Sequence, residues 1–205
     1  MQNDFNILNP KALWQEIKDI FNLIISPQFD NLNSRWSDNF TERFFKIFSI
    51  GIACFIVSIT NNATFSNFNI FNPLLDNTII FPLYVLLAIY LTDNLIQLFL
   101  KKFEAKNLSL NKTRDIMVNF LCIMPVNKIQ IPLDSSLYKL NFVVGFYFFW
   151  WAYRFMKVTL LQILECNPKK IHRFLIITAI ILVIIFFSLG IWLHHVRFMN
   201  NAYST

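Results

Sequence analysis

The chain has 205 residues, of which 56% are hydrophobic and 15% are charged, and its formal net charge at pH 7 is +6. A soluble domain of this size could not cover so much apolar surface with polar groups, so the composition excludes an ordinary soluble protein and indicates an integral membrane protein. The basic excess is explained by cytosolic loops that face anionic lipid, so nucleic acid binding need not be invoked.

The first 43 residues precede the first apolar segment and lack a cleavable secretory signal, so we expect them to be cytosolic. Within them, Asn9 is a natural cap, Pro10 suits the first helical position, and apolar residues recur at helical spacing until Pro27. This pattern predicts an amphipathic helix over 10–26. It lies flat at the cytosolic interface, or it packs on the protein's own spans or on a partner. Its apolar residues are Leu13, Trp14, Ile17, Ile20, Phe21 and Ile24.

Residues 44–196 contain five apolar segments, and 197–205 follow as an outer tail. Because a membrane-spanning helix needs about 20 predominantly apolar residues, these segments predict an all-α bundle of five transmembrane helices after the interfacial helix. The third segment is short and ends near Pro125, so it either crosses or dips in and returns. The predicted spans are about 44–60, 79–100, 113–127, 140–164 and 174–193.

Most of the 18 Lys and Arg residues lie in three regions, namely 11–46, 101–114 and 169–173. Because short cytosolic connections retain basic residues, these three regions are predicted to be cytosolic. Five crossings, with the N-terminus in the cytosol and the C-terminus outside, satisfy this rule. The location is then a bacterial inner membrane or an organelle membrane.

Ionisable residues inside two predicted spans are the candidate functional groups. Tyr90, Asp93, Asn94 and Gln97 share one helical face, which we expect to point into the bundle. In the fourth span Arg154 and Lys157 also share a face, at a depth similar to that of Asp93. We therefore predict that Asp93 pairs with Lys157 or Arg154. The alternative is a polar cavity that binds an ion, a proton or a lipid headgroup.

Catalytic signatures are absent from the sequence: it has no serine nucleophile elbow, glycine-rich phosphate loop or paired-carboxylate arrangement. The three cysteines lack the spacing of a metal site, and two of them fall within predicted spans. We therefore expect a protein that is not an enzyme and that uses neither a cofactor nor a metal.

The order of the elements carries a resemblance to a known family. The chain has an Asn9-Pro10 helix, a long second span ending in Lys101-Lys102, a linker with Ser109 and Arg114, a short third span with Pro125, a Trp-bearing fourth span, and a Pro168-Lys169-Lys170 turn before the last span. In this it resembles the Yip-type family of five-span membrane proteins, in its divergent prokaryotic branch. The resemblance implies a role in membrane organisation, trafficking or permease-like transport of lipids or solutes.

Two other classes of function also fit the sequence. One is a membrane-embedded immunity protein that captures a toxin through its outer loops, residues 61–78 and 127–139. The other is a small structural subunit of a larger membrane complex. In every case we expect the lipid bilayer to be a partner, with anionic headgroups at the inner loops and a possible protein partner in the membrane.

Overall fold

The structure, a computed structural model, describes residues 9–29, 40–65, 71–131, 135–137, 139–178 and 180–181. The chain forms two compact units, Met1–Cys166 and Asn167–Thr205. In the second unit, residues 168–178 are helical. Most of the predicted fifth span, 174–193, lies outside the described residues.

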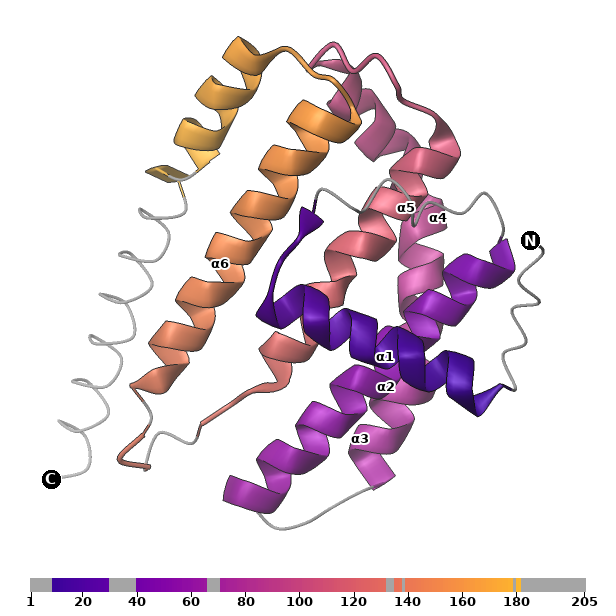
Figure 1. Ribbon diagram of the computed structural model, residues 1–205, viewed down its shortest axis with the longest axis vertical. Helices are drawn as coiled ribbons and strands as arrows, with labels where there is room; N and C mark the ends of the chain where they lie inside the picture. The colour runs from indigo at the N-terminus through magenta and orange to yellow at the C-terminus, as the bar shows by residue number, and fades with distance from the viewer. Residues whose placement is uncertain are drawn as a thin grey trace, which may run out of the picture. The chain divides into compact units, whose positions relative to one another are not determined.

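All the regular elements among the described residues of the first unit are helices, and none is a strand, which confirms the all-α prediction (Figure 1). Most are α-helices, with short π or 3-10 stretches where the backbone winding changes. The elements in chain order are α1 (Pro10–Ile25), α2 (Phe40–Phe65), α3 (Phe71–Leu75), π-helix η2 (Asp76–Ile80), α4 (Phe81–Lys101), α5 (Leu110–Phe120), 3-10 helix η3 (Leu121–Lys128), α6 (Leu140–Val158) and π-helix η4 (Thr159–Ile163).

Two stretches of helix among the described residues are long and apolar enough to cross a membrane, Phe40–Asn61 and Phe71–Lys101. The second is continuous because α3, η2 and α4 follow one another without a break. The predicted segment 113–127 is α5 followed by η3, which contains Pro125. A proline inside a helix removes one backbone donor, which explains why the regular α-helix ends before it.

Helix α1 confirms the amphipathic helix predicted from the sequence, and it begins as expected, because the Asn9 side chain accepts a hydrogen bond from the backbone N–H of Lys11. Of its predicted apolar residues, Ile17, Ile20 and Ile24 are buried, while Leu13 and Phe21 are half-buried and Trp14 is 54% exposed. The apolar face packs against α2 and η3. Of the two predicted arrangements, the apolar face of α1 therefore packs on the protein's own helices.

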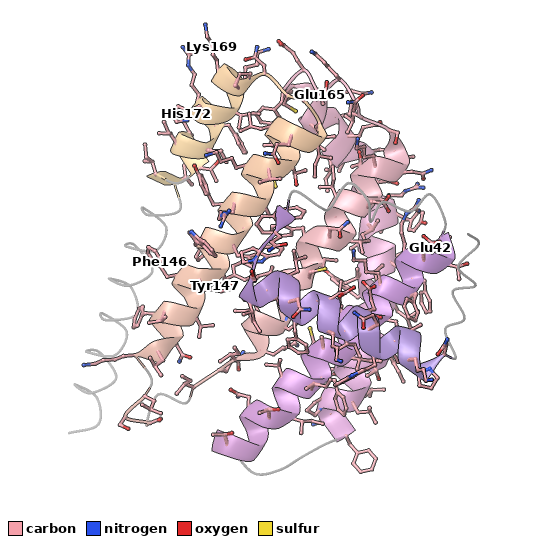
Figure 2. All side chains as sticks on the ribbon, viewed as in Figure 1. Glu42, Phe146, Tyr147, Glu165, Lys169 and His172 are labelled. Carbon is pink, nitrogen blue, oxygen red and sulfur yellow. The ribbon has the colours of Figure 1, made fainter. Side chains whose placement is uncertain are left out.

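The C-terminal end of α1 is held by two aromatic residues of α6. The Trp151 indole donates to the carbonyl of Leu23 at 3.1 Å, and the Tyr147 hydroxyl donates to the carbonyl of Ile24. The last carbonyls of a helix lack partners within the helix, so these bonds satisfy two of them. Figure 2 marks Tyr147, which reaches α1, and its neighbour Phe146, which is 81% exposed.

The chain leaves η3 along residues 129–131, and two asparagines fix this segment. The Asn61 amide of α2 both donates to the carbonyl and accepts from the N–H of Gln130. The Asn141 amide of α6 does the same for Ile131. Each side chain thereby replaces the backbone partners that a helix would have provided.

Gly51 of α2 lies directly against the backbone of η2, and this close approach leads to a prediction. A Cβ atom at Gly51 would overlap the Asn77 carbonyl oxygen and lie 3.3 Å from Pro82 Cγ, whereas a Cβ at Gly145 of α6 would meet nothing within 4 Å. We expect Gly51→Ala to lower the free energy of unfolding by about 1–3 kcal/mol, because the two helices must separate. Gly145→Ala should raise it by up to about 1 kcal/mol.

The two glycine variants serve as controls for each other, because both add one methyl group to a helix. Unfolding of each in detergent micelles, followed by circular dichroism, gives the two values. A Gly51→Ala protein as stable as wild type would contradict the close contact between α2 and η2.

Candidate functional site

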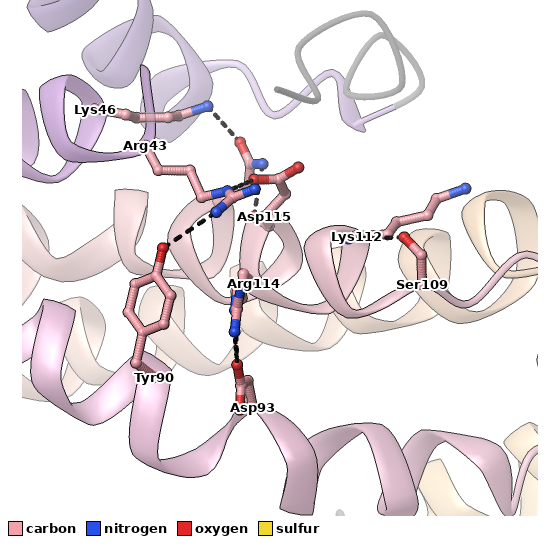
Figure 3. Close-up of polar contacts among 9 residues, drawn as sticks. Arg43, Lys46, Tyr90, Asp93, Ser109, Lys112, Arg114 and Asp115 are labelled. Atoms are coloured by element: carbon pink, nitrogen blue, oxygen red, sulfur yellow. Dashed lines mark hydrogen bonds and ion pairs between the residues drawn. The ribbon is translucent and has the colours of Figure 1, made fainter. Parts of the chain in front are cut away.

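The described residues contain one cluster of buried charged side chains, at the place where α2, α4 and α5 meet (Figure 3). Arg43 of α2 donates through Nε to the Asp115 carboxylate of α5 at 2.8 Å, and both side chains are 5% exposed. The Arg43 Nη1 group donates to the Tyr90 hydroxyl of α4 at 3.3 Å. Arg43 therefore links all three helices.

A second ion pair joins α4 to α5 beside the first. The Arg114 guanidinium contacts Asp93 Oδ2 through Nε and Nη2, both at 2.6 Å, and its centre lies 4.3 Å from the centroid of the Tyr90 ring. The Asp93 side chain is 1% exposed and that of Arg114 19%. A buried carboxylate is stable only when it is paired and hydrogen-bonded, and here both conditions are met.

Lys46 extends this cluster by one turn of α2. Its ammonium group donates to Asn119 Oδ1 at 2.5 Å, and the Asn119 amide donates in turn to the Asp115 carbonyl. Among the described residues the cluster therefore combines three cationic side chains with two carboxylates. The Nη2 group of Arg43 is buried and has no hydrogen-bond acceptor. The cluster carries an excess of one positive charge.

The start of α5 explains how Arg114 and Asp115 reach the interior. Ser109 caps the helix, its hydroxyl accepting from the backbone N–H of Lys112, so α5 begins at Leu110. Arg114 and Asp115 then lie just beyond its first turn. Arg114 was predicted to belong to the basic cytosolic region 101–114, at the very start of the third span, and it was not considered as a partner for Asp93. The Ser109 cap, which starts α5 at Leu110, was the signal that could have identified it as part of a helix.

The polar stripe predicted on α4 is present only in part. Tyr90 and Asp93 enter the cluster, as expected of residues that face the bundle. Asn94 is exposed and Gln97 is half-buried, so the prediction that all four point inward is wrong for Asn94. A helical face defined by steps of three and four residues is wide, and Asn94 lies at its outer margin.

The predicted partners of Asp93 are also wrong. Asp93 pairs with Arg114, while Arg154 and Lys157 of α6 are exposed. The Arg154 guanidinium lies 5.3 Å from the centroid of the Trp150 ring. The prediction compared depths along two helices, but depth does not determine which faces of those helices meet.

An apolar groove of about 500 Å³ is formed by α4, α5, η3 and α6. All of its lining side chains are apolar or aromatic. They are Phe81, Tyr84, Val85, Ala88, Ile89, Ile96, Phe99 and Leu100 of α4, Ile116, Met117 and Phe120 of α5, Leu121 and Met124 of η3, and Phe155 and Met156 of α6.

The second ion pair does not line this groove, but it joins two of the helices that do. Asp93 shares its face of α4 with Ile89 and Ile96, and Arg114 shares its face of α5 with Met117. The pair therefore fixes the spacing of the two helices on which most of the groove is built.

The three cysteines are buried, and none forms a disulfide. Outside the predicted spans, burial raises the pKa of the Cys166 thiol above its ordinary value, so at neutral pH it is almost entirely in the less reactive protonated form. Within the described residues, no group of three or more His, Cys, Asp or Glu side chains could hold a metal ion.

We compared the chain with known protein families, curated proteins and solved structures. No family model, curated protein or solved structure matches this chain.

Proposed function

We propose that this chain is an integral membrane protein that crosses the bilayer five times and binds membrane lipid without catalysing a reaction. Besides the two apolar helices, a row of exposed leucines along α4 supports a membrane location. These are Leu83, Leu87, Leu91, Leu95 and Leu98, each at least 60% exposed. Water would not favour such a surface, whereas acyl chains would.

The proposed topology has the N-terminus in the cytosol and the C-terminus outside. It rests on the basic residues in regions 11–46, 101–114 and 169–173, which all fall on one side if five segments cross. The resemblance to the Yip-type family agrees with this number of spans. It extends the proposed role to membrane organisation, trafficking or permease-like handling of lipid.

The apolar groove is the observation that carries the proposal. Protein interiors are packed closely, with few voids larger than a water molecule, and about 300–1,000 Å³ is the usual volume of a ligand site. A groove of about 500 Å³ with apolar lining on four helical elements falls within this range for ligand sites. Because the surrounding helices face lipid, we assign an acyl chain as its occupant.

Photolabelling tests this assignment. The protein is reconstituted in nanodiscs with phosphatidylcholine that bears a diazirine on its acyl chain, irradiated, and mapped by mass spectrometry. We expect labels at groove residues such as Met117 and Met124. Ala88→Trp, which fills the groove, should lower this labelling several-fold. Leu87→Trp, one residue away on the exposed face, should leave it unchanged.

Labels spread evenly over the exposed leucines of α4, with no enrichment in the groove, would overturn the assignment. So would an Ala88→Trp variant that is labelled at Met117 as strongly as the wild type.

A small structural subunit is the second candidate. It is favoured by α6, where Phe142 and Phe146 are 77% and 81% exposed and Gly145 between them has open space above it. Membrane helices associate at such sites because a small residue lets the backbones approach. Purification from the native membrane, with a protein partner in stoichiometric amount, would support this candidate. The outer loops needed for toxin capture lie partly outside the described residues.

A further inference from the structure

The groove ends beside basic side chains. On α4 its lining stops at Leu100, and the next two residues, Lys101 and Lys102, are exposed. In the proposed topology this is the cytosolic end. An acyl chain in the groove would therefore bring its headgroup close to two ammonium groups.

Arg114 is a third cation, outside the groove lining but on α5, which contributes to that lining. Its contacts with Asp93 use Nε and Nη2, so Nη1 takes part in neither of them. The side chain is 19% exposed and lies one turn from Met117 of the lining. A guanidinium group has five N–H donors in a planar fork that matches phosphate geometry. Arg114 can therefore hold Asp93 and still donate to a phosphate.

The charge balance favours an anion here. The neighbouring cluster carries three cations against two carboxylates, and Arg43 has a buried N–H group without an acceptor. Buried charges are screened less than exposed ones, so the excess positive charge raises the potential nearby. A zwitterionic headgroup would bring its own cation into this field, whereas an anionic one would not.

We propose that the groove selects an anionic phospholipid of the cytosolic leaflet, whose phosphate is bound by Lys101, Lys102 and Arg114. This inference rests on the proposed function, because it names the headgroup of the lipid whose acyl chain occupies the groove.

Two diazirine-bearing probes of equal chain length, phosphatidylglycerol and phosphatidylcholine, separate the two claims. Each is added in trace amount to nanodiscs of unlabelled phosphatidylcholine, and labels in the groove are counted. We expect phosphatidylglycerol to label the groove at least about fivefold more than phosphatidylcholine, since about fivefold is what electrostatic attraction by a single lysine near a membrane implies.

A charge-matched pair of variants locates the headgroup. The double variant Lys101→Gln/Lys102→Gln should remove the preference and keep the labelling by phosphatidylcholine. The control variant Lys128→Gln/Lys139→Gln makes the same change of net charge at the end of η3 and just before α6. In the proposed topology these positions lie on the outer side of the membrane, so this variant should keep the preference. Because Lys101, Lys102 and Lys139 are exposed and Lys128 lies at the end of η3, these changes leave the packed interior intact.

The outcomes distinguish this inference from the proposed function. Equal labelling of the groove by both probes would overturn the headgroup assignment and leave the acyl-chain site standing. A preference lost in Lys128→Gln/Lys139→Gln but kept in Lys101→Gln/Lys102→Gln would also overturn it. If neither probe labels the groove, the proposed function and the inference fail together.

Discussion

Replacing Asp93 with Ala is expected to lower the free energy of unfolding by about 3 kcal/mol, because it leaves the Arg114 guanidinium beside Tyr90 without its carboxylate. We take the lower end of the range for broken buried ion pairs, since the Arg114 side chain is 19% exposed. Arg114→Met should cost a similar amount because it leaves Asp93 buried and unpaired. Denaturant unfolding in detergent micelles gives both values.

The double variant Asp93→Leu/Arg114→Met should recover most of this loss, since removing both charges also removes the cost of burying them. Arg154→Met and Lys157→Met are the controls on α6, and each should change the stability by less than about 1 kcal/mol. If Arg154→Met were as costly as Arg114→Met, the assignment of Arg114 as the partner of Asp93 would be wrong.

Trp151→Ala is expected to be the most damaging single change, with a loss of about 3–5 kcal/mol from the cavity alone. The indole is fully buried, and its ring lies 5.0 Å from that of Phe29 and 5.4 Å from that of Phe155. The substitution also deprives the Leu23 carbonyl of its donor. The measurement is again unfolding in micelles, with the near-ultraviolet signal as a report on aromatic packing.

Two further variants divide this effect into its parts. Trp151→Phe keeps most of the ring but loses the indole N–H, so it should cost about 1–3 kcal/mol for the unsatisfied carbonyl. Trp150→Ala removes the adjacent, 41% exposed tryptophan and should cost less than about 1 kcal/mol. Equal losses for Trp150→Ala and Trp151→Ala would contradict the packing described for α6.

Local patterns predicted the helices well. The Asn9 cap and Pro10 define the start of α1 to the residue, and the apolar steps to Ile24 define its buried face. The predicted spans 44–60, 79–100 and 140–164 each overlap a helix or a continuous pair of helical elements. These features follow from residues close to one another in the chain, where spacing and capping act directly.

The composition of the site could not be predicted in the same way. Asp93 was a sound candidate, because a carboxylate within an apolar helix requires a partner. Its partner depends on the rotation of α4 and α5 about their axes, and single-helix periodicity does not fix how two helices face each other. Arg43 was missed because basic residues before a span are ordinarily explained by the cytosolic side of the membrane.

The contacts between α1 and α6 can form only late in the synthesis of the chain. Leu23 and Ile24 receive their hydrogen bonds from residues 128 and 123 positions later in the chain. At about 5–20 residues per second, the ribosome takes roughly 6–25 s to make the intervening chain. The helix made first therefore completes its contacts only after α6 has emerged. Until then the Leu23 and Ile24 carbonyls lack these two donors, although the apolar face of α1 can already pack against α2, which is made earlier.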